Sequence, residues 1–185
     1  IKTRLYKFNS NLKILPNEIK EIINTVDFLF RRLLSKNYKF IKKNNIKFKV
    51  PINKQILSPS DMGKHNTIFK QNIYSFYDFE YFGRDDPVKL ICDIILNPNT
   101  FKEKILLKDF FIKFVYLFGD KSFLIRYKLT FRLHLLKWVL IILKKFAESD
   151  HRQSFNINNK QLKKSRYYLI EYNNFNSTLN LFSDI

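Results

Sequence analysis

The chain has 185 residues, of which 34 are Lys or Arg and 16 are Asp or Glu, so its formal net charge is +18. Hydrophobic residues make up 45% and aromatic residues 17%, which is enough apolar surface to form a core. Three isolated glycines exclude a Gly-rich phosphate loop, a single cysteine excludes an internal disulfide and CxxC metal sites, and three scattered histidines provide no HExxH motif. We therefore expect no catalytic residues, no metal site and no cofactor.

Residues 2–8 alternate in a two-residue period and predict a short strand. A helix should begin at Pro16, because proline suits the first helical position. The apolar residues that follow recur at i, i+3 and i+4, so they form one core-facing stripe. This stripe comprises Ile19, Ile22, Ile23, Val26, Leu29, Phe30 and Leu33.

From Phe40 the period changes, and apolar residues alternate with lysines up to Val50. A second extended run, over 72–82, is dense in aromatic residues, as strands prefer. Together the two runs predict a long β-ribbon with its tip between Pro51 and Lys70.

The triplet Asp85-Asp86-Pro87 predicts the start of a second helix, which should end at Asn97-Pro98. We interpret the two carboxylates as capping residues, although they resemble a catalytic pair. A last strand is expected over 101–107. The resulting order, β-α-β-β-α-β, predicts an α+β fold with a ferredoxin-like domain and a long β-hairpin in residues 1–108.

A mainly helical extension is expected over 109–148, with helices at 109–118 and 121–146. The polar, basic segment 149–185 is expected to be a tail that is ordered only on a partner. Cys92 is interpreted as a small core residue, and Trp138 as a packing residue, with base stacking as the alternative. The second helix of the extension carries a leucine stripe formed by Leu129, Leu133, Leu136, Leu140 and Leu143.

Basic residues gather in three stretches that contain no acidic residue. Residues 28–60 hold nine, residues 121–147 hold seven, and five more lie between Asp150 and Glu171. A solvated surface normally mixes both signs, so these stretches favour binding to a phosphate backbone; a merely solvated lysine-rich surface is the alternative. The acidic residues gather elsewhere, on a side that faces solvent or a basic protein neighbour. They are Asp78, Glu80, Asp85, Asp86 and Asp93.

Composition also bears on location. Lys, Asn, Ile, Phe and Tyr, whose codons are rich in A and T, account for 97 of the 185 residues, which is typical of AT-rich genomes such as those of protist organelles. This bias favours Asn as much as Lys, so the surplus of positive charge still indicates a polyanionic partner. Charges interrupt the most apolar stretch, 123–146, so no transmembrane segment is predicted, and no secretory signal is expected.

Several segments resemble the S-ten family of small-subunit ribosomal proteins. That family opens with the pattern R-L-x-x-F-[DN]-x-x-L, and Ile56-Leu57-Ser58-Pro59 with Lys64 is similar to its SPHVNK segment. The helix expected over 87–96 and the strand over 101–107 are similar to its final elements in order and length. The resemblance covers about residues 2–108. The residues that match the opening pattern are Arg4, Leu5, Phe8, Asn9 and Leu12.

The resemblance implies a non-enzymatic, structural constituent of the mitochondrial small ribosomal subunit, in its head. Its partners would be small-subunit ribosomal RNA and neighbouring ribosomal proteins. The alternative is an accessory subunit of a mitochondrial respiratory membrane complex, because the 110–146 region is apolar enough to lie against one. The residues predicted to bind rRNA are Arg4, Lys7, Arg31, Arg32, Lys42, Lys43, Lys47, Lys49, Lys54, Lys64 and His65.

Overall fold

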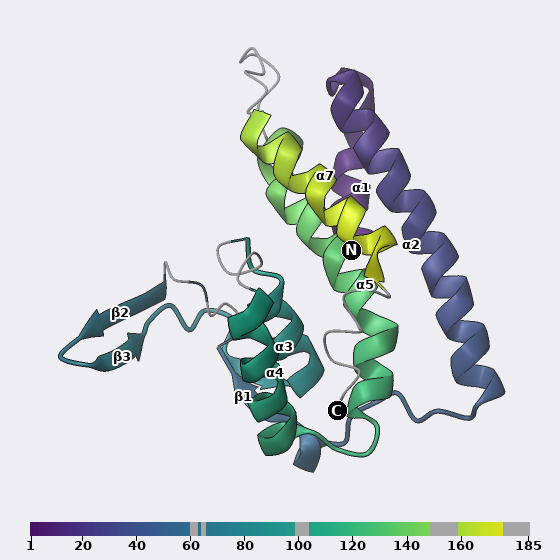
Figure 1. Ribbon diagram of the computed structural model, residues 1–185. Helices are drawn as coiled ribbons and strands as arrows, with labels where there is room; N and C mark the ends of the chain where they lie inside the picture. Colours follow the sequence, from purple (N-terminus) through teal and green to yellow (C-terminus); the bar gives the residue numbers. More distant parts are fainter. Residues whose placement is uncertain (60–62, 64–65, 99–103, 149–158, 176–185) are drawn as a thin grey trace. The chain divides into compact units, whose positions relative to one another are not determined.

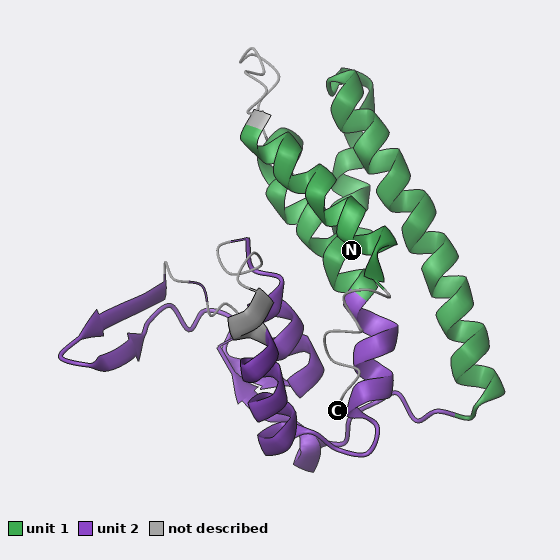
Figure 2. Cartoon of the chain, in the orientation of Figure 1, with its two compact units in different colours: residues 1–45, 132–178 green, residues 46–131, 179–185 purple. Residues whose placement is uncertain are grey.

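A computed structural model describes residues 1–59, 63, 66–98, 104–148 and 159–175, and it combines two small antiparallel sheets with a helical C-terminal part (Figure 1). This arrangement confirms the α+β class. The chain divides into two compact units, the first made of Ile1–Asn45 with Arg132–Thr178 and the second containing Ile46–Phe131 (Figure 2). These units differ from the predicted segments 1–108, 109–148 and 149–185, because the N-terminal helices pack with C-terminal ones.

The first helix, α1 (Lys2–Ser10), replaces the strand predicted over 2–8. Its two buried residues, Leu5 and Phe8, are three positions apart and therefore lie on one side of a helix. Lys, Arg and Leu are good helix formers, and neither Gly nor Pro occurs before Pro16. The strand prediction is wrong because so short an alternation is also compatible with helical periodicity.

Helix α2 (Asn17–Lys43) confirms the predicted helix, with Pro16 as its N-cap residue. It continues well past the predicted stripe, so the prediction of a β-ribbon over 40–50 is wrong. The helix ends only at Asn44-Asn45, where Asn45 adopts a φ of 48° that asparagine tolerates. Among the residues predicted for the stripe, the buried ones are Ile19, Ile22, Ile23, Val26, Phe30 and Leu33.

The first unit also contains the part of α5 (Phe123–Ile142) from Arg132 onward and two further helices: α6 (Lys144–Glu148) contacts α1, and α7 (Asn159–Asn173) contacts α2. Asn11 Nδ2 donates a hydrogen bond of 3.0 Å to the carbonyl of Ala147. Leu162, Tyr168 and Tyr172 of α7 are buried. The prediction of a tail ordered only on a partner is therefore wrong for 159–173, because these residues have a core-facing side; the tail's segments 149–158 and 176–185 lie outside the described residues.

The sheets of the second unit are two separate pairs of strands. Strand β1 (Ile56–Ser58) pairs with β4 (Gly83–Asp85), and β2 (Thr67–Lys70) pairs with β3 (Ile73–Phe76). The four-stranded sheet of a ferredoxin-like domain is thus not confirmed among the described residues.

A β-hairpin does occur, but its position differs from the predicted one. Strand β3 lies in the predicted run 72–82, and its partner is β2 instead of residues 40–50. The hairpin turns at Gln71 and Asn72, whose φ angles of 51° and 61° are those of a two-residue type I′ turn.

Helix α3 (Pro87–Ile95) confirms the predicted helix and its cap, because Asp86 accepts a hydrogen bond of 2.9 Å from the amide of Val88.

Helix α4 (Lys104–Phe118) includes the helix predicted over 109–118 and begins earlier. The strand predicted over 101–107 is therefore wrong for 104–107, where good helix formers extend α4; residues 101–103 lie outside the described part. Helix α5 (Phe123–Ile142) confirms most of the helix predicted over 121–146.

An aromatic cluster forms much of the core of the second unit. Tyr127 of α5 lies at the centre, with ring centroids 4.8 Å from Phe111 and 5.1 Å from Phe131. Its complete burial raises the pKa of its hydroxyl well above the ordinary value. Cys92 of α3 is also fully buried, which confirms its interpretation as a core residue.

Arg126 is buried in this unit between two carboxylates. Its Nε donates a hydrogen bond of 2.9 Å to Asp86, and its Nη1 donates one of 3.0 Å to Asp120 and another to the hydroxyl of Ser122. Only 1% of Arg126 is exposed. Since Asp86 also caps α3, these ion pairs tie the start of α3 to α5 and to the turn that precedes it.

Replacing Arg126 with methionine should therefore destabilise the protein strongly. Removing one member of a buried ion pair costs about 3–5 kcal/mol, and we expect Arg126→Met to lower the free energy of unfolding by that amount. Arg31→Met is the matched control, because Arg31 pairs with Asp27 at 2.8 Å on an exposed surface, where such pairs contribute about 1 kcal/mol or less. Urea unfolding followed by circular dichroism measures both, and equal losses would contradict the role of Arg126.

The same site should make stability depend on acidic pH. Partial burial alone would raise the pKa of Asp120, but hydrogen bonds from Arg126 and Ser122 outweigh it and lower the pKa to about 2 from 3.8. A carboxylate with a lower pKa in the folded state contributes stability that is present above its unfolded pKa and is lost as the pH falls through the folded one. We expect the stability difference between wild type and Asp120→Asn to shrink by roughly 2 kcal/mol from pH 6 to pH 2. A difference that stays constant with pH would show that Asp120 is not stabilised in this way.

Candidate nucleic-acid interface

The second half of α2 carries a line of cations, which we name the α2 basic stripe: Arg32, Lys36, Lys39 and Lys43. They recur at i, i+4, i+7 and i+11, so they lie on one side of the helix over roughly 16 Å. All four are exposed. At 100° per residue, the centre of this side lies roughly 120° around the helix from the centre of the buried stripe, so the cations flank the core-facing side and are open to solvent.

Few acidic groups compensate these charges. Arg31 pairs with Asp27, but none of the four residues of the stripe forms an ion pair with the described part of the chain. No acidic residue occurs in the sequence from Phe28 to Ser60. The stripe thus presents a concentrated positive potential, which a polyanion can neutralise.

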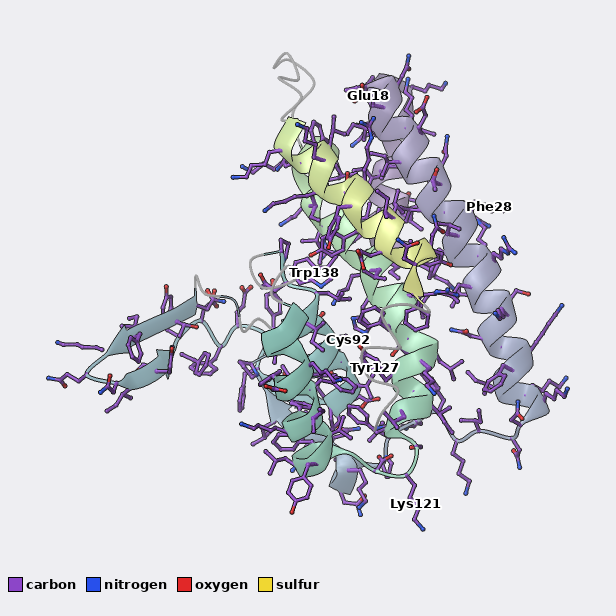
Figure 3. All side chains as sticks on the ribbon, in the orientation of Figure 1. Glu18, Phe28, Cys92, Lys121, Tyr127 and Trp138 are labelled. Carbon is purple, nitrogen blue, oxygen red and sulfur yellow. The ribbon has the colours of Figure 1, made fainter. Side chains whose placement is uncertain are left out.

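Exposed aromatic side chains accompany the stripe on the same helix. Phe28, one turn before Arg32, is 62% exposed on the outward side of α2 (Figure 3). Tyr38 and Phe40 are 68% and 47% exposed. Unstacked bases bind to aromatic rings of this kind while cations hold the backbone, which is the usual arrangement for single-stranded nucleic acid.

The structure places the predicted residues in separate groups. Arg31, Arg32, Lys42 and Lys43 are all exposed on α2. Sequence reasoning left Lys36 and Lys39 out of the site, although their helical spacing to Arg32 was a usable signal. The strand predicted from Phe40 hid only the helical spacing of Lys43 to these residues.

A second basic group surrounds a pocket in the same unit. Arg4 and Lys7 of α1 line it together with Lys144 of α6, and Phe8 and Leu140 add apolar walls. The pocket has a volume of about 340 Å³. The predicted residues Arg4 and Lys7 thus come together with a third cation that is distant in sequence.

The other predicted residues belong to the second unit. Lys47, Lys49 and Lys54 are exposed on the segment before β1, which forms no strand around Val50. Val50 is buried but Phe48 is 38% exposed, so the predicted alternation of lysines with inward-facing residues does not hold here. Lys64 and His65 lie outside the described residues.

In the described ranges, no group of three or more His, Cys, Asp or Glu side chains is placed to hold a metal ion. None of the helices described is both long and apolar enough to cross a membrane. Comparisons with family models, curated proteins and solved structures find no match for this chain. The charge and exposure of α2 are therefore the main evidence on function.

Removing two charges from the α2 basic stripe should weaken RNA binding in a salt-dependent way. Each phosphate contact contributes roughly −0.7 to the slope of log affinity against log salt for a single strand, so Lys36→Gln/Lys39→Gln should make the slope shallower by about one to two units. The matched control is Lys13→Gln/Lys70→Gln, which removes two exposed charges from other elements. Fluorescence anisotropy with labelled single-stranded RNA measures both slopes, and equal slopes would remove the stripe from the interface.

Proposed function

We propose that this chain is a non-enzymatic RNA-binding protein and a structural constituent of the mitochondrial small ribosomal subunit. The α2 basic stripe carries this proposal, because four exposed cations without acidic partners lie along one side of a single helix. Their charges repel each other, and a phosphate backbone relieves that repulsion.

The chemistry of binding is electrostatic and largely independent of base sequence. Lys and Arg of the stripe neutralise successive phosphates, and the release of counterions drives association. Phe28, Tyr38 and Phe40 provide rings on which unpaired bases stack, so a loop or single-stranded stretch of rRNA suits the surface better than a regular duplex. The pocket beside Arg4, Lys7 and Lys144 offers further phosphate contacts in the same unit.

The ribosomal setting is supported by the sequence. The AT-rich composition is typical of organelle genomes, and the pattern at 4–12 and the Ser58-Pro59 segment resemble the S-ten family. The order of a hairpin followed by α3 agrees with that resemblance, whereas α1 stands where the family has a strand. The proposal therefore depends on the charge distribution more than on a shared fold.

One observation favours the alternative, an accessory subunit of a mitochondrial respiratory membrane complex. Helix α4 exposes apolar residues near its end, with Tyr116 88%, Leu117 67% and Phe118 44% exposed. A surface of this kind suits an apolar neighbour, which a membrane complex would provide.

Sedimentation of detergent-solubilised mitochondria from the source organism separates the two functions. We expect the chain to sediment with the small ribosomal subunit at moderate salt, to remain with it in non-ionic detergent, and to be released by RNase or by high salt. Mass spectrometry of each gradient fraction identifies the chain and its neighbours. Recovery with a respiratory complex, unaffected by RNase, would replace the proposed function by the alternative.

A further inference from the structure

The β2–β3 hairpin exposes apolar residues on both faces and buries neither face. In its register Phe69 faces Tyr74, and Thr67 faces Phe76, so these residues share one face; the Phe69 and Tyr74 ring centroids are 4.5 Å apart. Ile68 and Ile73 share the opposite face with Lys70 and Ser75. These two isoleucines and the three aromatic residues are all between 40% and 65% exposed. A two-stranded sheet without a buried face is only marginally stable on its own. The exposed rings and isoleucines of this hairpin therefore lack a surface that covers them.

The chain after β3 continues the same pattern. Tyr77, Phe79, Tyr81 and Phe82 are 47–66% exposed. We call residues 67–82 the aromatic arm. Its large apolar side chains, each burying 150–250 Å² when covered, expose on the order of 1,000 Å² in total. This total, summed over both faces of the hairpin and the segment after it, is similar to the roughly 800 Å² that one partner buries in a standard protein interface.

Charge distinguishes the arm from the rest of the chain. Asp78 and Glu80 are exposed, and Lys70 is the only basic residue between Asn66 and Phe82, although the whole chain has a net charge of +18. An RNA backbone would meet two carboxylates and a single cation here, so the arm repels the ligand that the α2 basic stripe attracts. A protein surface with an apolar centre and a basic rim matches both its rings and its carboxylates.

We propose that the aromatic arm is a docking element for a second protein, whose surface provides an apolar groove bordered by Lys or Arg. Phe69, Tyr74 and Phe76 enter the groove. Asp78 and Glu80 pair with its basic rim. The outer edge of β2 or β3, which has no neighbouring strand in the described structure, is available for main-chain hydrogen bonds to the partner. This inference does not require α2 to bind RNA.

Photo-crosslinking with the full chain tests the proposal. The recombinant protein carries p-benzoylphenylalanine in place of Tyr74, and a second preparation carries it in place of Tyr38 on α2. Each is irradiated in a mitochondrial extract of the source organism, with and without RNase, and adducts are identified by mass spectrometry. Unlabelled wild type and a Phe69→Ser/Tyr74→Ser/Phe76→Ser variant serve as competitors.

The expected result is a Tyr74 adduct to one protein that is insensitive to RNase and whose crosslinked segment contains Lys or Arg. Wild type should compete for it, the serine variant should not, and Asp78→Asn/Glu80→Gln should reduce the yield about two- to tenfold. Whether the Tyr38 adduct contains RNA tests the proposed function separately. A failure of α2 to bind RNA can therefore be told apart from a failure of the arm to bind a protein. Thermal unfolding of the serine variant should remain within a few degrees of wild type, because the arm adds little to the core.

Four crosslinking results would each overturn the inference. They are a Tyr74 adduct to RNA, an adduct only to a second copy of this chain, no adduct above background, and competition by the serine variant equal to that of wild type. A large loss of thermal stability in the serine variant would also overturn it, since the arm would then pack against its own chain.

Discussion

Arg126 is the only Lys or Arg that is buried among the described residues, and the second unit is arranged around it. Burying a guanidinium is favourable only where carboxylates compensate its lost hydration, and Asp86 and Asp120 do so. Asp86 simultaneously caps α3 and directly follows β4. The ion pairs of Arg126 therefore fix where the β1–β4 sheet ends, where α3 begins and how α5 packs on both. The remaining described cations lie at the surface or are half-buried, where a polyanion can reach them.

Lysines are abundant throughout the sequence, but folding determines where they lie. The helical period of α2 gathers Arg32, Lys36, Lys39 and Lys43 on the side that the core does not use. The aromatic arm, in the other unit, collects rings and carboxylates and nearly excludes cations. Two surfaces of opposite character thus belong to different units, and each is complete within its own unit. Such a division suits a protein that joins an RNA to a protein neighbour.

Prediction from the sequence succeeded where many residues supported one kind of element. It failed where a segment was compatible with both the strand period and the helix period. The long stripe of α2 and the Asp86-Pro87 cap identified their helices, because many residues or a specific hydrogen bond agreed. Residues 2–8 are too few to distinguish alternation from helical spacing. The hairpin was expected, yet its register was missed because Gln71-Asn72 lacks the glycine that marks most type I′ turns. For the candidate interface, the acid-free basic run carried by α2 is visible in the sequence, whereas the meeting of Arg4 with Lys144 depends on tertiary packing.

The pairing of β1 with β4 has a consequence for how this protein can change over evolutionary time. Ser58 and Gly83 are register partners, so the two short strands close the chain between them into a loop that contains the aromatic arm. The entropy of closing a flexible loop grows only slowly, by about 0.6 kcal/mol for each doubling of length. Insertions and deletions within this loop therefore leave the helical core almost unaffected. The arm can therefore be lengthened, shortened or replaced without disturbing the contacts around Arg126.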